Sequence, residues 1–288
     1  MKKLNFRTLL VAALLIIGVS IVSCDKDNVS GSGKLKIQLT DAPFPTDLVS
    51  EANVTISKID IRKSGDAEGN PFITLSEEEM SFNLLDLTNG VTASLVDLEI
   101  EAGSYDLVRL YVSEASIVLK DGTEFDLKVP SGAQTGIKIF INPSIDVVGG
   151  LTAELLLDFN VAKSFVAQGD INSPEGINAF NFTPVIKASN LSTAGRLTGT
   201  VTDAETAAET AAIDGAQVSI IAADTVYTTT FSDINGAYAI IGVDAGTYTV
   251  EFAKEGFETA TIEEVSIIAA NETTQDAQLT AIVEEVVE

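Results

Sequence analysis

The sequence predicts an all-β protein, with two β-sandwich domains in tandem behind a cleaved signal peptide. After residue 33, apolar residues recur at every second position in one segment after another, which is the pattern of strands with one buried face. No stretch in this part of the chain has a long helical period. A small, polar stretch without alternation, residues 189–195, divides the segments into two series, and we place the domain junction there.

Residues 1–23 have the pattern of a signal peptide. Lys2, Lys3 and Arg7 precede an apolar run over residues 9–22, which is shorter than the roughly 20 residues of a membrane-spanning helix. The segment Ile21-Val22-Ser23-Cys24 resembles the bacterial lipobox, in which a small residue precedes the Cys that is lipidated and becomes the mature N-terminus. The resemblance implies lipidation of Cys24. The alternatives are a plain secretory signal with a chance Cys and a helical anchor.

Residues 24–33 are expected to form a lipidated, flexible tether. Asp25, Lys26 and Asp27 are similar to the export signal that sends lipoproteins of certain Gram-negative phyla to the outer face, and an ordinary charged tether is the alternative. Two or more acyl chains on one Cys anchor a protein stably without a spanning segment. We therefore expect a lipid-anchored protein of the outer membrane that is exposed at the cell surface.

The residue types that the chain lacks exclude several kinds of catalytic and metal site. The chain has no His, no Trp and one Cys. Without His there is no Ser/His or Cys/His nucleophile pair and no imidazole metal site, and a lone Cys forms neither an internal disulfide nor a thiolate zinc site. We therefore expect no enzyme activity, no catalytic residues, no metal site and no cofactor.

The charge balance is strongly acidic. Without residues 1–23 the chain keeps 14 basic residues against 42 acidic ones, a net charge of −28. A polyanion repels the phosphate backbone, so nucleic acid is excluded as a partner, and we attribute the charge to solubility.

In residues 34–190 the strand signals follow in order. Residues 34–39 alternate polar and apolar without a fault, and residues 117–120 and 123–129 flank Asp121-Gly122 as a hairpin. Residues 84–95 have room for one short helical turn. Five apolar residues two apart, from Leu151 to Phe159, predict a further strand. Phe180 and Phe182, with Pro184 after them, predict the final strand of the domain.

Residues 195–282 predict about seven shorter strands, and residues 283–288 form an acidic tail. The motifs of this part are Gly199-Thr-Val-Thr-Asp203, Gly215-Ala-Gln-Val218, Ser232-Asp-Ile-Asn-Gly-Ala-Tyr238, Asp244-Ala-Gly-Thr-Tyr-Thr-Val250 and Glu255-Gly-Phe257. Together they resemble the carboxypeptidase regulatory-like domain, a transthyretin-like sandwich with a carbohydrate-binding-like fold. The resemblance implies a core that holds Tyr238 and Tyr248, and it does not establish sugar binding.

The earlier part is similar to the family called domain of unknown function 4382, found in bacterial lipoproteins. The motifs are Leu39-Thr-Asp-Ala-Pro43, Asn53-Val-Thr-Ile56, Gly103-Ser-Tyr-Asp-Leu-Val-Arg-Leu110, Val129-Pro-Ser-Gly132, Leu157-Asp-Phe159 and Pro184-Val-Ile-Lys187. The resemblance implies a β-rich exported domain and no activity. Glu101-Ala-Gly-Ser-Tyr105 also repeats the pattern of Asp244-Ala-Gly-Thr-Tyr248, which we interpret as one turn-into-strand device used twice, with an internal duplication as the alternative.

Two acidic positions are candidates for ligands, and both have a structural interpretation that we favour. Asp41 fits an Asx-type turn that closes the first strand. Asp233 and Asn235 are similar to the opening of a calcium loop, but the twelfth position is Asp244 rather than the bidentate Glu, so we expect a hairpin turn.

The sequence favours a non-catalytic cell-envelope lipoprotein that acts as a structural or interaction module at the outer membrane. The expected partners are the membrane, through the lipid on Cys24, and an envelope protein. The alternative is a carbohydrate-binding accessory lipoprotein with a glycan as partner, which the lack of Trp and the low aromatic content of 6% count against. An enzyme that works with carboxylates alone is the third class.

Overall fold

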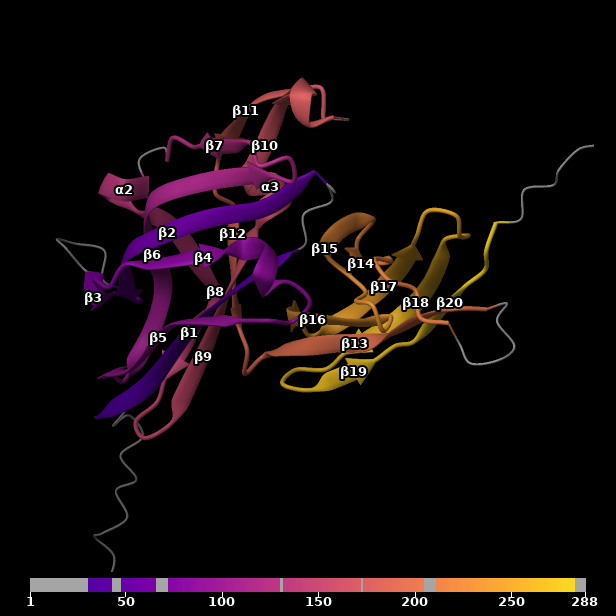
Figure 1. Cartoon of the computed structure of the whole chain (residues 1–288). Coiled ribbons are helices and arrows are strands. Elements are labelled where there is room, and N and C mark those ends of the chain that lie inside the picture. Colours follow the sequence, from indigo (N-terminus) through magenta and orange to yellow (C-terminus); the bar gives the residue numbers. More distant parts are fainter. Residues whose placement is uncertain are drawn as a thin grey trace, which may run out of the picture. The chain divides into compact units, whose positions relative to one another are not determined.

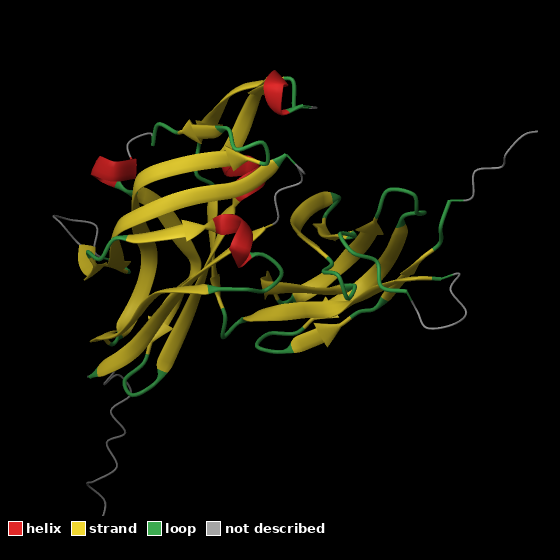
Figure 2. Cartoon of the chain, in the orientation of Figure 1, coloured by secondary structure: helices red, strands yellow, loops and turns green. Residues whose placement is uncertain are grey.

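The computed structural model describes residues 31–42, 48–65, 72–129, 132–171, 173–204 and 211–282. Strands make up 68% and helices 6% of the structure, which confirms the all-β prediction (Figures 1 and 2). The predicted signal peptide, the tether up to residue 30 and the acidic tail lie outside the described residues. Within the described ranges, the helices are all too short or too polar to span a bilayer.

The first domain is a β-sandwich with short helical turns at its strand ends. Its elements are β1 (Ser32–Ala42), β2 (Val49–Lys63), β3 (Phe72–Ser76), β4 (Met80–Asn83), η1 (Leu84–Leu87), β5 (Ala93–Glu101), β6 (Gly103–Leu119), β7 (Glu124–Asp126), α2 (Gly132–Thr135), β8 (Ile137–Val147), β9 (Thr152–Asn160), α3 (Val161–Ser164), β10 (Phe165–Gly169), η2 (Pro174–Gly176), β11 (Ile177–Phe182) and β12 (Ile186–Asn190).

Two sheets enclose the core of this domain. One has the order β12-β9-β1-β5, with β1 and β9 parallel and the other pairs antiparallel. The other has the order β3-β2-β6-β7, with β4 also on β2 and β8 also on β6. Figure 1 shows the long strands β2 and β6 side by side. Leu35, Ile37 and Leu39 alternate with polar residues on β1 and are fully buried, which confirms the predicted strand.

Two strand predictions need correction. Leu151 was expected to share the buried face of β9, but it lies before the strand begins, in the turn after β8, and is 62% exposed. The strand that carries Phe180 and Phe182 is not the last of the domain, because β12 follows it and pairs with β9. β11 pairs instead with β10 as a hairpin, and Phe182 packs with Phe159 and Phe165 in the core.

The local turn chemistry follows the sequence closely. Gly122 has φ of 88°, a left-handed conformation that suits glycine, and the Asp121 carboxylate accepts a hydrogen bond from the Thr123 N–H at 2.8 Å. Ile117 therefore pairs with Phe125 across the hairpin. The predicted helical turn is η1, in which the Asn83 side chain accepts a hydrogen bond from the Leu85 N–H.

In the described residues, the second domain is a smaller sandwich of eight strands. They are β13 (Ala194–Asp203), β14 (Gln217–Ala222), β15 (Thr225–Phe231), β16 (Ala237–Asp244), β17 (Gly246–Ala253), β18 (Ala260–Ile267), β19 (Glu272–Thr274) and β20 (Ala277–Leu279). One sheet has the order β16-β13-β19, with β20 also on β13, and the other has the order β15-β14-β17-β18. Val250 and Phe252 on β17 are fully buried in a core that, as far as the chain is described, shares no residue with the core of the first domain.

Candidate functional site

The residues predicted to anchor and export the protein cannot be placed in the structure. Cys24, Asp25, Lys26 and Asp27 all lie outside the described residues. The lipid anchor and the export signal therefore stay predictions.

Asp41 has a structural role that differs from the expected local turn. It lies next to the end of β1 and is buried, and its Oδ1 accepts a hydrogen bond from the backbone N–H of Val161 at 2.9 Å. Burial raises the pKa of this carboxyl well above its usual range, and the nearby charge of Asp158 adds to the rise. The contact ties the end of β1 to the first turn of α3, far away in the sequence.

The Asp233 turn is the hairpin that we expected. The Asp233 carboxylate accepts hydrogen bonds from the backbone N–H groups of Asn235 and Ala237 at 2.8 and 2.9 Å, and Gly236 has φ of 74°. The carboxylate thus stabilises the turn between β15 and β16. Among the described residues, no group of three or more Asp, Glu, Cys or His side chains is placed to hold a metal ion.

The two Gly-(Ser/Thr)-Tyr motifs form the same structure in both domains. The Tyr105 hydroxyl donates to the Glu101 carbonyl at 2.7 Å, and the Tyr248 hydroxyl donates to the Asp244 carbonyl at 2.8 Å. In each case the phenol reaches back over four residues and fixes the turn that leads into a strand. Tyr105 is fully buried whereas Tyr248 is only half-buried, so the two positions differ in their packing.

The junction of the two domains is short and closely packed. β12 ends at Asn190 and β13 begins at Ala194, and Gly31–Glu288 form one compact unit. Leu156 on β9 is fully buried although it belongs to neither core, and a Cβ at Gly242 on β16 would come within 2.7 Å of its Cδ2. Gly242, with φ of 74°, therefore allows β16 to approach Leu156.

Asn89 pairs with the backbone of β16 as another strand would. Its Oδ1 accepts from the Ala239 N–H at 2.5 Å, and its Nδ2 donates to the Ala237 carbonyl at 3.4 Å. Because β16 is an edge strand of its sheet, these bonds satisfy backbone groups that would otherwise face solvent.

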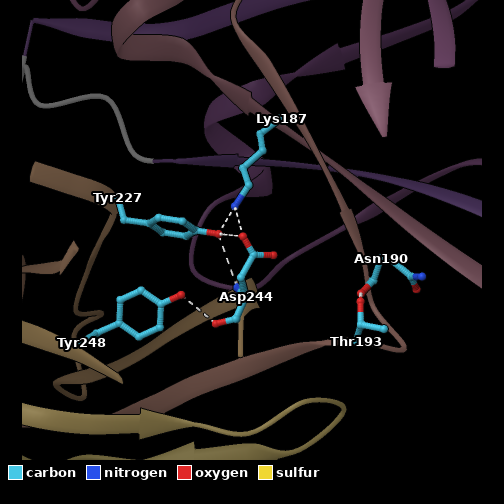
Figure 3. A network of polar contacts seen from close by, with 6 residues as sticks. All are labelled: Lys187, Asn190, Thr193, Tyr227, Asp244 and Tyr248. Atoms are coloured by element: carbon cyan, nitrogen blue, oxygen red, sulfur yellow. Dashed lines mark hydrogen bonds and ion pairs between the residues drawn. The ribbon is translucent and has the colours of Figure 1, made fainter. Parts of the chain in front are cut away.

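A polar network joins side chains of β12, β15 and β16 (Figure 3). The Tyr227 hydroxyl donates to Asp244 Oδ2 at 2.7 Å and accepts from the Asp244 N–H at 3.3 Å. Lys187 on β12 donates to the same hydroxyl, lies 3.8 Å from the centroid of the Tyr227 ring, and forms an ion pair with Asp244 at 3.4 Å. The network joins β12 of the first domain to β15 and β16 of the second.

Lys187 also compensates a carboxylate in its own sheet. It pairs across the strands with Asp158 on β9. Burial raises the pKa of Asp158 to about 6, and the positive charge of Lys187 opposes that rise. Lys187 thus lies between two carboxylates, one from each domain.

The first domain also carries an open polar groove of about 520 Å³ over β2, β4, β6 and β7. Hydroxyl, amide and carboxylate groups line most of it, among them those of Asn53, Thr55, Ser81, Ser113, Glu124 and Asp126. Such groups can bind a polar partner by hydrogen bonds, and the groove offers no nucleophile and base pair of the types that His or Cys would supply.

The sequence did not point to the junction residues. Lys187 and Asp244 stand inside motifs that carry the family resemblances, but their ion pair joins the two motifs across the domain boundary. Tyr227 had no sequence signal, because it stands outside the motifs that carry the family resemblances.

Comparison with known proteins identifies two family models in the chain. The model described as "Domain of unknown function (DUF4382)" matches residues 32–184, and that of the carboxypeptidase regulatory-like domain matches residues 196–280. Both agree with the sequence-based assignments. No curated protein matches the chain.

Several solved structures are similar over parts of the chain. A chain of the type II cohesin–X-dockerin complex of Acetivibrio cellulolyticus is 26% identical, with 29% of this chain and 52% of that chain covered and a TM-score of 0.24. The present chain thus spans about half of its length. The shaft pilin SpaA of Lactobacillus rhamnosus GG is 12% identical, with 90% and 100% covered and a TM-score of 0.28. The minor pilin of Streptococcus agalactiae is 9% identical, with 88% and 98% covered and a TM-score of 0.27.

Proposed function

Because the chain belongs to the DUF4382 family and carries a carboxypeptidase regulatory-like domain behind that segment, we propose that it is a non-catalytic cell-envelope lipoprotein. In this proposal the lipid on Cys24 anchors it in the outer membrane, and the two β-domains act as a structural or interaction module at the cell surface. An envelope protein or a glycan is the partner.

The observation that carries the proposal is the place where the tether enters the fold. The lipobox-like Cys24 stands shortly before β1, and β1 is an inner strand of its sheet. Its backbone is hydrogen-bonded to β5 on one side and to β9 on the other. A pull on the anchor therefore acts on a strand that is held along both edges, as a tethered module requires.

The path of the chain beyond β1 supports the same conclusion. The first domain passes into the second through a turn of residues 191–193. Asn89 of the first domain bonds to the backbone of β16, and Lys187 of the first domain forms an ion pair with Asp244 of the second. A link of this kind transmits force and position from the anchored domain to the other. An interaction module needs this transmission of force and position, but it needs no catalytic group.

The Cys24→Ala variant tests the anchor. The lipid is the only hydrophobic anchor in this proposal, so the variant should move from the membrane pellet to the soluble fraction after a high-salt wash. Ser30→Ala in the tether is the matched control and should stay in the pellet. A Cys24→Ala protein that still pellets with outer membranes would remove the basis of the lipoprotein proposal.

A further inference from the structure

A turn without polar side chains connects β8 to β9. It consists of Val148, Gly149, Gly150 and Leu151, and the Leu151 N–H donates to the Val148 carbonyl at 3.0 Å. The Val148 side chain is 43% exposed and that of Leu151 62% exposed. Surface turns are usually built from polar residues, so two apolar side chains in contact with solvent here are an exception to that rule.

Other turns of this protein follow the usual composition. The turns β6-β7, β14-β15, β15-β16 and β18-β19 contain Asp121, Asp224, Asp233 and Asn271. A single exposed apolar residue, such as Ile234 between Asp233 and Asn235, is common on protein surfaces and needs no partner. The β8-β9 turn differs, because its two exposed apolar residues and two glycines follow one another without a polar side chain between them.

The β8-β9 turn lies against the residues at which the tether enters the fold. The Gly150 N–H donates to the Ser32 carbonyl at 3.0 Å, and the Lys34 N–H donates to the Leu151 carbonyl at 2.9 Å. A Cβ at Gly33 would come within 2.3 Å of a carbonyl oxygen of the turn, so this glycine lets the two backbones approach. The start of β1 and the β8-β9 turn therefore lie together at one end of the first domain.

The length of the tether keeps this end of the domain near the proposed lipid. Gly31 follows Cys24 by seven positions, and a chain of that length spans at most about 25 Å. A lipid on Cys24 would therefore hold the β8-β9 turn within reach of the bilayer surface. A short link of this kind gives a second contact an effective concentration on the order of mM. An apolar contact too weak to hold the free protein on a membrane can thus form in the anchored protein.

The charges around the turn indicate which lipid surface it can contact. Lys34 forms an ion pair with Asp97 at 2.8 Å and Lys63 with Glu101 at 3.1 Å, so these cations are already compensated. Asp146, two residues before the turn, accepts a hydrogen bond from a serine hydroxyl at 2.6 Å. From Cys24 onward the chain has a net charge of −28, which an anionic surface repels. A neutral or zwitterionic lipid surface is compatible with this end of the domain.

We propose that the β8-β9 turn contacts a neutral or zwitterionic lipid surface, with Val148 and Leu151 at the boundary of headgroups and acyl chains. The contact is a second, reversible attachment beside the lipid on Cys24, and it fixes the orientation of the first domain on the membrane. A lipid surface is favoured over a protein partner, because the tether itself brings the lipid to this turn. The inference rests on the proposed function of the tether, but the contact can be measured with any lipid linked to Cys24.

The composition of the chain offers a direct probe of this contact. The chain has no Trp, so Leu151→Trp introduces a single fluorophore at the turn. It has one Cys, so the protein that starts at Cys24, the mature form in this proposal, can be coupled through that residue to a maleimide lipid in phosphatidylcholine vesicles. Because this coupling is chemical, the result does not depend on whether cells lipidate Cys24.

On coupling to vesicles, the tryptophan emission of Leu151→Trp should shift to shorter wavelengths, and lipids with brominated acyl chains should quench it. Apolar groups that lie in a membrane interface reach roughly 5–10 Å into the boundary of headgroups and acyl chains. Val148→Asp in the same protein should abolish the shift and the quenching, because it places a charge in that boundary. Val148 and Leu151 are exposed, so the melting temperature should stay unchanged in both variants.

Ile234→Trp is the matched control, because Ile234 is 79% exposed in a turn of the second domain. Its fluorescence should not change on coupling, and equal quenching of the two tryptophan variants would mean that the β8-β9 turn does not make the contact. An unchanged Leu151→Trp emission, or a Val148→Asp variant that is quenched as strongly as its parent, would overturn the proposal and leave the turn to a protein partner.

Three further outcomes separate the other occupants and the anchor. A shift in lipid-free protein that grows with protein concentration would assign the turn to a second copy of the chain and overturn the proposal. Contact with anionic vesicles alone would overturn the choice of lipid. Contact of the coupled protein, together with a Cys24→Ala protein that still pellets with outer membranes, would refute the proposed lipid anchor and support the contact made by the turn.

Discussion

Replacement of Tyr238 tests whether the second domain uses its tyrosines as core or as a binding surface. The Tyr238 side chain is 2% exposed, its ring packs edge-on against Phe252 at 5.8 Å between centroids, and its hydroxyl donates to the Gln275 carbonyl at 2.5 Å. Tyr238→Ala should lower the free energy of unfolding by about 3–5 kcal/mol, because the truncation removes a buried ring and leaves a cavity.

Two further variants divide that loss into its parts. Tyr238→Phe keeps the ring and removes only the donor to Gln275, so it should cost about 1–2 kcal/mol. Tyr248 is half-buried and packs against Tyr227 at 5.7 Å between centroids, so Tyr248→Ala should cost less than Tyr238→Ala, on the order of 2 kcal/mol.

Urea unfolding of the purified protein, followed by circular dichroism, measures these losses. A glycan titration of each variant should run beside it. If Tyr238→Ala lowers the free energy of unfolding by less than about 1 kcal/mol, the core assignment is refuted, because the removal of a buried ring of this size costs more than that. A Tyr248→Ala protein that keeps its stability but loses a demonstrable affinity for an oligosaccharide would show that this tyrosine belongs to a binding surface.

Three other predictions concern the pH dependence of stability, the independence of the domains and the export signal. The pKa of Asp158 in the folded state, about 6, lies above its unfolded value of about 4, so the folded state binds this proton at a higher pH than the unfolded state. The contribution of Asp158 to stability should therefore rise as the pH falls from 7 to 4. Asp158→Asn should remove on the order of 2 kcal/mol of this pH dependence, and identical pH profiles of the two proteins would contradict it. Residues 33–190 and 195–288 should each melt cooperatively when expressed alone, because each has its own core, and a half without a transition would show that the boundary is wrong. Charge-neutral replacement of Asp25, Lys26 and Asp27 should keep the protein lipidated but protect it from protease added to intact cells, whereas equal digestion would show that this segment is no export signal.

Local patterns were enough to predict several strands and turns of this protein. The alternation in residues 34–39, the Asp121-Gly122 hairpin and the Asp233 turn depend on neighbours in the sequence, and the structure has them where they were expected. The repeated Gly-(Ser/Thr)-Tyr motif is also local, because each tyrosine bonds to a carbonyl four residues earlier. The absence of His and the single Cys restricted the chemistry in the same way, from composition alone.

The contacts across strands and between domains needed the tertiary structure. The register of β2 and β6 shifts at four places, so the pairing that sets Asp60 opposite Arg109 cannot be counted from the sequence. The final strand β12 was missed because residues 186–190 have no clear alternation, and tertiary pairing with β9 makes them a strand. Lys187 meets Asp244 only because β12 and β16 come together at the junction. The sequence determined the local strands and turns, and packing decided which side chains meet, because those meetings join positions far apart in the chain.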